Sequence, residues 1–173
     1  MTRDQKIVAT GAASGVLAMA AAMWGLSRAL PVPAGLDTVA DRLGFALRWD
    51  AVASVPFFAM IVVIGNARAL GPAIDPTLGR EDPAMLINGR VADNTLQQLV
   101  IFVVATLALA ASLPAAQMSV IAAAAIVFTV ARLVFWIGYR VHPLYRAPGF
   151  AGTAYLNFGL IGAALYFAVA NTL

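Results

Sequence analysis

Arginines, aromatic side chains and the single histidine of the chain gather in one stretch, residues 131–150. Arg132 is its unusual member, because residues 94–131 carry no charge and the apolar run around Arg132 has not yet ended. A charge inside a bilayer costs about 2.5–3.5 kcal/mol or more, so such a residue normally faces other helices and has a polar partner. The alternative is that its long side chain extends to the lipid headgroups. We expect Arg132 to be buried and paired, since Trp136 and Tyr139 already lie nearer the interface.

A second polar pattern lies on the preceding apolar segment, where Arg90, Asn94 and Gln97 recur on one helix face. Two roles fit these groups. One is a clasp between helices, worth about 1 kcal/mol or less per hydrogen bond. The other is a pocket for an anion, because the arginines of both stretches have only Asp93 as a nearby acid. The arginines concerned are Arg90, Arg132, Arg140 and Arg146.

Composition identifies the elements that must position these residues. Hydrophobic residues make up 62% of the 173-residue chain and charged residues 11%, whereas a soluble domain carries about 25% charged residues. The sequence therefore predicts an integral membrane protein built from helices. It contains no cysteine and one histidine, which excludes thiolate and histidine-rich metal sites. It also lacks the basic run with interleaved aromatics that binding of single-stranded nucleic acid needs.

Hydropathy predicts five membrane spans, and prolines and glycines mark the turns between them. The first four are residues 7–30, residues 49–70, residues 84–112 and a fourth span that ends near Val141; the fifth is residues 153–171. Residues 31–48 are expected to form a polar loop, and Pro56 to kink the second span. Gly11 and Gly15 lie four apart, a spacing that permits close approach of another helix.

Depth within the membrane predicts a partner for Arg132. The third and fourth spans form an antiparallel hairpin whose turn is centred near Pro114. Residues equally distant from that turn lie at similar depth, so Arg132 should be level with Asn94 to Gln97 and one helical turn from Asp93.

The distribution of cations predicts the orientation of the chain. With five spans, the N-terminus and the loops at 70–84 and 141–152 share one side of the membrane. That side holds seven cations: Arg3, Lys6, Arg68, Arg80, Arg90, Arg140 and Arg146. The other side holds three: Arg28, Arg42 and Arg48. Because cytoplasmic loops carry the excess of Lys and Arg, we expect a cytoplasmic N-terminus and an external C-terminus, in a bacterial inner membrane.

The two polar patterns resemble those of a known family. Arg90-x-x-x-Asn94-x-x-Gln97 followed by Arg132-x-x-Phe135-x-x-x-Tyr139 and Arg146 is similar to the MAPEG family, the membrane-associated proteins of eicosanoid and glutathione metabolism. The resemblance covers residues 47–173 as a four-helix membrane domain, and residues 1–46 would add an extra transmembrane helix and a loop. It implies an all-α homotrimer in the bilayer, with glutathione bound between subunits near the cytoplasmic face.

The resemblance also implies roles for individual residues. Arg146 would stabilise the glutathione thiolate, with Tyr139 as a second catalytic group. Glutathione-binding positions would be Arg68, Arg90, Asn94, Gln97 and Arg132; no metal is implied. The activity implied is that of a glutathione-dependent transferase or peroxidase, in which the thiolate attacks a hydrophobic small molecule.

Two positions depart from the family pattern. Gln97 stands where the family usually has glutamate, and Phe135 stands where several members have tyrosine. These departures favour the alternative of a non-catalytic ligand-binding or scaffold protein on the same fold. A transporter is the third class considered, but no internal repeat of the kind found in transporters is visible in the sequence.

Overall fold

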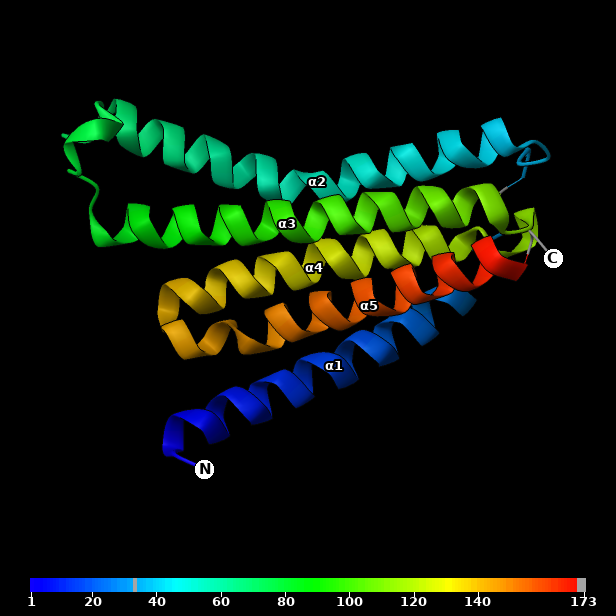
Figure 1. Ribbon diagram of the computed structural model, residues 1–173, viewed down its shortest axis with the longest axis horizontal. Helices are drawn as coiled ribbons and strands as arrows, with labels where there is room; N and C mark the ends of the chain where they lie inside the picture. Colours follow the sequence, from blue (N-terminus) through cyan, green and yellow to red (C-terminus); the bar gives the residue numbers. More distant parts are fainter. Residues whose placement is uncertain (33, 171–173) are drawn as a thin grey trace.

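The computed structural model describes residues 1–32 and 34–170 of the chain. Its five long helices lie side by side (Figure 1), and each is long and apolar enough to cross a membrane, so the predicted five-span all-α fold is confirmed. No strand occurs in the described residues. The helices are α1 (Arg3–Ala29), α2 (Val39–Ala69), α3 (Pro83–Ser112), α4 (Ser119–Val141) and α5 (Ala147–Ala170). Short 3₁₀ turns are η1 (Pro76–Leu78), η2 (Ala115–Gln117) and η3 (Pro143–Arg146).

The packing order places the N-terminal helix on the outside of the other four. Helix α1 packs against α5 and α4, whereas α2 packs against α3 and α4 on the opposite side. The start of α1, the α2–α3 connection and the α4–α5 connection all lie at the left end in Figure 1. This arrangement agrees with the alternation of five antiparallel spans, and it brings the two cation-rich connections to the same end as the N-terminus.

Two helix boundaries differ from the sequence prediction. Helix α2 begins about ten residues earlier than expected, because Thr38 and Asp41 form a reciprocal capping box that starts the helix at Val39. The polar segment predicted as a loop is therefore largely helical, and α2 runs without a break through residues 46 and 47. Helix α5 begins at Ala147 instead of residue 153, since Pro148 lies in its first turn, where a missing backbone N–H costs nothing.

A largely apolar core joins α3, α4 and α5. Phe102 of α3 and Phe128 of α4 are fully buried, with ring centroids 4.5 Å apart. Helix α2 bends near its middle (Figure 1), close to the buried Pro56, as the sequence predicted. Elsewhere the outer faces of the helices expose large apolar side chains, as a membrane-spanning bundle requires.

Close approach of backbones fixes α1 and α5 in place. A Cβ at Gly15 would overlap the backbone of Pro148, and a Cβ at Gly149 would overlap the backbone of Phe135. Gly11 also lies against Ala147 and Pro148, so the predicted use of the Gly11–Gly15 spacing for helix approach is confirmed. These contacts dock the start of α5 between α1 and α4.

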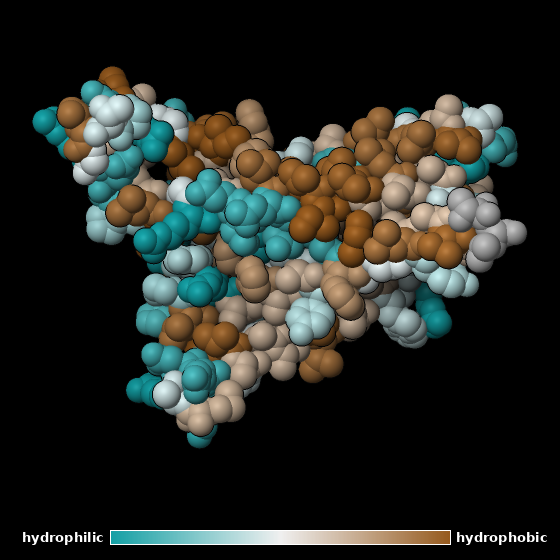
Figure 2. All heavy atoms as spheres, in the orientation of Figure 1, coloured by the Kyte–Doolittle hydropathy of each residue, from teal (hydrophilic) through white to brown (hydrophobic). Residues whose placement is uncertain are grey.

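Hydrophilic residues extend further into the bundle from one of its ends than from the other. In Figure 2 they occupy the left end and extend inward over the first half of α3, whereas the rest of this face is mostly apolar. This polar zone is the region in which the residues selected from the sequence lie.

Candidate functional site

A cavity of about 530 Å³ lies at the polar end of the bundle. Its walls come from α1, α3, the last turns of α4, and the η3 turn with the start of α5. Four of the residues selected from the sequence line it together: Arg90, Asn94, Tyr139 and Arg146. The fold therefore brings both sequence patterns to a single space.

Helix α3 supplies one polar wall. The carboxylate of Asp82 caps this helix by accepting from the backbone N–H of Met85 at 2.7 Å, which fixes where the helical register begins. Arg90 and Asn94 then lie one turn apart on the same face. Arg90 is exposed and Asn94 is half-buried, so the cation lies nearer the mouth and the amide deeper.

The opposite wall carries Arg146 and Tyr139. The η3 turn holds Arg146, whose Nη1 donates to the carbonyl oxygen of Pro143 at 2.8 Å. Its guanidinium carbon lies 5.1 Å from the centre of the Tyr139 ring, in a cation–π arrangement. Within the described residues the Tyr139 hydroxyl makes no hydrogen bond, so this donor is available to a ligand.

Arg132 lies behind the cavity wall and is completely buried. Its Nη1 donates to Asn94 Oδ1 at 2.9 Å and its Nη2 to the carbonyl oxygen of Gly149 at 3.4 Å. Its guanidinium also stacks on the Phe135 ring at 4.2 Å. The predictions that Arg132 is buried and that its partner lies at the level of Asn94 are confirmed.

The expectation that Asp93 is a partner of Arg132 is wrong. Asp93 is exposed and forms no ion pair with Arg132. The physical reason is angular: neighbouring residues on a helix point about 100° apart, so Asn94 faces inward and Asp93 faces outward at almost the same depth. Among the described residues, Arg132 is thus a buried cation whose partners are two neutral acceptors and an aromatic ring, and its Nε has no hydrogen-bond partner.

Pairing with Arg132 also orients Asn94. Because the guanidinium donates to the amide oxygen, the amide nitrogen of Asn94 is left to donate into the cavity.

The only ion pair in the described residues joins Arg68 Nη2 to Glu81 Oε1 at 3.3 Å. Arg90 and Arg146 therefore have no carboxylate partner, and the cavity presents two uncompensated cations to whatever enters it.

Four residues selected from the sequence do not line this cavity: Arg132 behind its wall, Arg140, Gln97 and Arg68. Gln97 is exposed on α3, about one turn beyond Asn94. Arg68 lies at the end of α2, where Glu81 of the α2–α3 connection binds it. Within a single chain the structure brings neither Gln97 nor Arg68 to the four residues that line the cavity.

The sequence also missed several residues of the site. Phe150 and Tyr155 of α5 form part of the cavity wall, and Val8 and Ala12 of α1 close another side. The apolar residues carried no distinguishing signal, because their types are common throughout a membrane helix. Tyr155 lies just over two turns after Ala147 on α5, but the span predicted from the sequence begins at residue 153, so helical periodicity could not relate Tyr155 to Arg146.

A separate polar pair lies toward the other end of the bundle. The buried Asp50 of α2 accepts a hydrogen bond from Thr106 of α3 at 2.8 Å. No group of three or more His, Cys, Asp or Glu side chains that could hold a metal ion occurs in the described part of the chain.

Comparison with protein families bears on both the fold and the cavity. The model of the MAPEG family matches residues 49–166, more than half of the chain. The chain belongs to the MAPEG family. The match begins in α2 and ends in α5, so it includes every polar residue of the cavity and leaves α1 outside. Comparison with curated proteins and with solved structures gives no match. MAPEG membership supports, in broad terms, a function related to glutathione chemistry at the membrane.

Proposed function

We propose that this MAPEG protein is a membrane glutathione-dependent transferase or peroxidase that stabilises a glutathione thiolate for attack on a hydrophobic substrate. The observation that carries the proposal is the convergence of Arg90, Asn94, Tyr139 and Arg146 on one cavity. Glutathione has two carboxylates and one ammonium group, and ionisation of its thiol adds a further negative charge. Two arginines without carboxylate partners complement this anion.

The thiolate end is assigned to Arg146. A guanidinium remains protonated at any physiological pH, so it stabilises the sulfur anion without titrating itself. Arg146 also lies at the start of α5, where the positive end of the helix dipole adds to the attraction. The Tyr139 hydroxyl is free to donate a second hydrogen bond to the same sulfur.

The peptide end is assigned to α3. Arg90 at the mouth binds a carboxylate of the tripeptide, and the amide nitrogen of Asn94 donates to a peptide carbonyl or to the second carboxylate. Arg132 acts indirectly, because it holds Asn94 and adds positive charge behind the wall. The protein needs no nucleophile of its own: the thiol proton leaves to solvent, and the sulfur bonds to an electrophilic carbon of a substrate that arrives from the lipid. The bond from that carbon to its leaving group breaks at the same time, and the leaving group departs with the electron pair.

In this proposal Gln97 and Arg68 contact glutathione only when the protein assembles as a homotrimer. Gln97 is exposed and the Arg68 side chain is 42% exposed, so each would reach the ligand across a subunit boundary. In such an assembly, changing Gln97 to Glu supplies the carboxylate usual in the family, and it should tighten glutathione binding.

Thiolate absorbance measured against pH tests the assignment, together with a glutathione titration of each variant. In the wild type the bound thiol should titrate below the free-thiol pKa of about 8.5. Arg146→Leu should raise the pKa of the bound thiol by about one unit, equivalent to about 1.4 kcal/mol, and leave affinity nearly unchanged. Arg90→Leu should instead weaken binding about tenfold or more, because a hydrogen bond to a charged group is worth about 1.5–3 kcal/mol.

Arg140→Leu is the matched control. Arg140 is exposed in the last turn of α4 and does not line the cavity, so its loss removes an equal charge and should change neither measurement. Failure of the wild type to bind glutathione at millimolar concentration would overturn the proposal.

One observation favours a second candidate, a non-catalytic ligand-binding or scaffold protein. Phe135 lines the cavity where a tyrosine hydroxyl would be expected from the family pattern, so one donor to the ligand is missing. The same titration separates the two functions. Glutathione binding with an unshifted thiol pKa supports the non-catalytic protein, and a lowered pKa supports the enzyme.

A further inference from the structure

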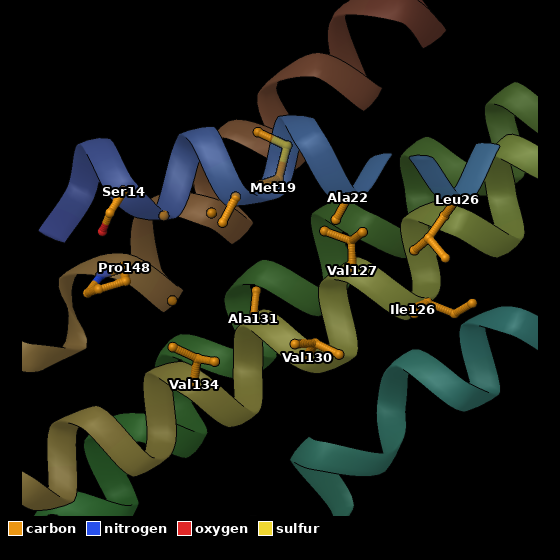
Figure 3. A pocket seen from close by; sticks show the side chains of 14 residues that line it. Ser14, Met19, Ala22, Leu26, Ile126, Val127, Val130, Ala131, Val134 and Pro148 are labelled. Carbon is orange, nitrogen blue, oxygen red and sulfur yellow. The ribbon is translucent and has the colours of Figure 1, made fainter. Parts of the chain in front are cut away.

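A groove of about 390 Å³ runs between α1 and α4, with the first turns of α5 as its floor (Figure 3). Ala22 and Leu26 of α1 face Val127 and Val130 of α4 across it. Its lining is almost entirely apolar, and Ser14 marks one end. The groove lies on the other side of α5 from the glutathione cavity: Gly149 and Gly152 face the groove, whereas Phe150 and Ala151 face the cavity.

The groove adjoins a space that a cation lines. A second cavity of about 480 Å³ shares Ser14 and Pro148 with it and is lined by Lys6, Thr10 and Tyr145. No carboxylate pairs with Lys6 in the part of the chain that the structure describes. The combined space therefore has a cation, hydroxyl groups and an aromatic residue at one end and a hydrocarbon-like lining at the other.

The dimensions match one leaflet of a bilayer. Ser14 and Leu26 bound the apolar part and are twelve residues apart on α1, which corresponds to about 18 Å of helix. Half of a hydrocarbon core of about 30 Å is about 15 Å, the depth that one acyl chain covers. A second helix of about 10 Å diameter would occupy roughly 1,400 Å³ over the same length, several times the volume of the groove.

We propose that this groove is a binding site for one anionic phospholipid, with an acyl chain between α1 and α4 and its phosphate beside Lys6. The charge at the polar end decides the headgroup, since a lysine without a carboxylate partner prefers an anionic lipid to a zwitterionic one. Lipid at this site covers the apolar surface that α1 leaves open against α4. The site is independent of the proposed thiol chemistry, because it shares none of the residues assigned to glutathione.

The test uses the full chain in nanodiscs that contain equal amounts of phosphatidylglycerol and phosphatidylcholine, with retained lipids identified by native mass spectrometry. The wild type should retain one phosphatidylglycerol per chain. Val130→Trp should abolish retention by filling the groove, whereas Leu133→Trp should not. Leu133 is also an exposed apolar residue of α4, but it does not line the groove.

The headgroup is tested separately. Lys6→Gln should lower the preference for phosphatidylglycerol about fivefold, whereas Arg3→Gln should leave it unchanged, because Arg3 does not line the space. Lys6 is exposed, so Lys6→Gln does not disturb packing. This variant therefore keeps the proposal falsifiable even where Val130→Trp fails to fold. Equal retention of both lipids in the wild type overturns the proposal, as does retention that survives Val130→Trp. Displacement of phosphatidylglycerol by free oleate at equal concentration overturns it in favour of a fatty acid.

Discussion

The buried Arg132 makes an unusual prediction: removing its partner should destabilise the protein more than removing the charge itself. Asn94→Leu would leave the guanidinium with a single carbonyl acceptor, at Gly149, in a site without exposure to solvent. Arg132→Met would instead remove the cation and keep much of its volume. The carbonyl of Gly149 would still accept from Thr153, and the half-buried Asn94 would remain reachable by water or ligand.

The magnitudes follow from these contacts. Loss of the Asn94 bond to a charged group should cost about 1.5–3 kcal/mol of unfolding free energy. Arg132→Met loses the same bond, the longer bond to the Gly149 carbonyl and a cation–π contact worth about 0.5–2 kcal/mol. It also removes a charge whose burial in a membrane costs about 2.5–3.5 kcal/mol, which offsets most of these losses, so the net cost should be smaller than that of Asn94→Leu. The double variant should be more stable than Asn94→Leu alone.

The assay is SDS titration of the protein in mixed micelles, followed by circular dichroism without glutathione. Each kcal/mol should also shift the melting temperature by about 2–4 °C. Gln97→Leu is the control, because Gln97 is an amide on the same helix that makes no bond to Arg132. If Arg132→Met proves as costly as Asn94→Leu, the charge is compensated by a group outside these contacts, such as one from another subunit, and the reasoning fails.

Two further predictions concern the other end of the bundle and the membrane orientation. Thr106→Val should destabilise the protein by about 1–3 kcal/mol in the same SDS titration, because it leaves the buried Asp50 carboxylate without its donor. Asp50→Leu should cost less, since the Thr106 hydroxyl also lies 3.0 Å from the carbonyl oxygen of Phe102; the opposite order would refute this. A reporter fused after α5 should be active outside the cytoplasm, and cytoplasmic activity would refute the orientation inferred from the cations.

The sequence predicts how deep a residue of this protein lies in the membrane better than it predicts the direction in which the side chain points. Hydropathy locates five spans because a bilayer imposes a minimum apolar length, and the hairpin around Pro114 then places Arg132 level with Asn94. Depth alone could not choose between Asp93 and Asn94, which are neighbours in the chain and differ by one step of helical rotation. That step decides whether Arg132 forms a buried ion pair or, as found, hydrogen bonds to neutral acceptors.

The ends of the helices show a second limit of prediction from the sequence. The early start of α2 has a signal in the sequence, Thr38-x-x-Asp41, but the high polarity of the segment around it favoured a loop. The docking of the start of α5 against α4 depends on Gly149 meeting the backbone of Phe135, a tertiary contact that no local pattern reveals. This contact matters for the site, because it carries Arg146 to the rim of the cavity opposite Arg90.

The position of α1 is the part of the structure that the sequence left undetermined, and it changes how the site must be understood. Hydropathy shows that α1 crosses the membrane, and the Gly11–Gly15 spacing indicates the face that packs, but neither identifies the helix against which it packs. Docking through Gly15 directs Val8 and Ala12 toward the polar cavity and Ser14 and Ala18 toward the apolar groove. The helix outside the family match therefore forms a wall of both spaces. The shape of the cavity in this protein consequently depends on a segment that lies outside the family match.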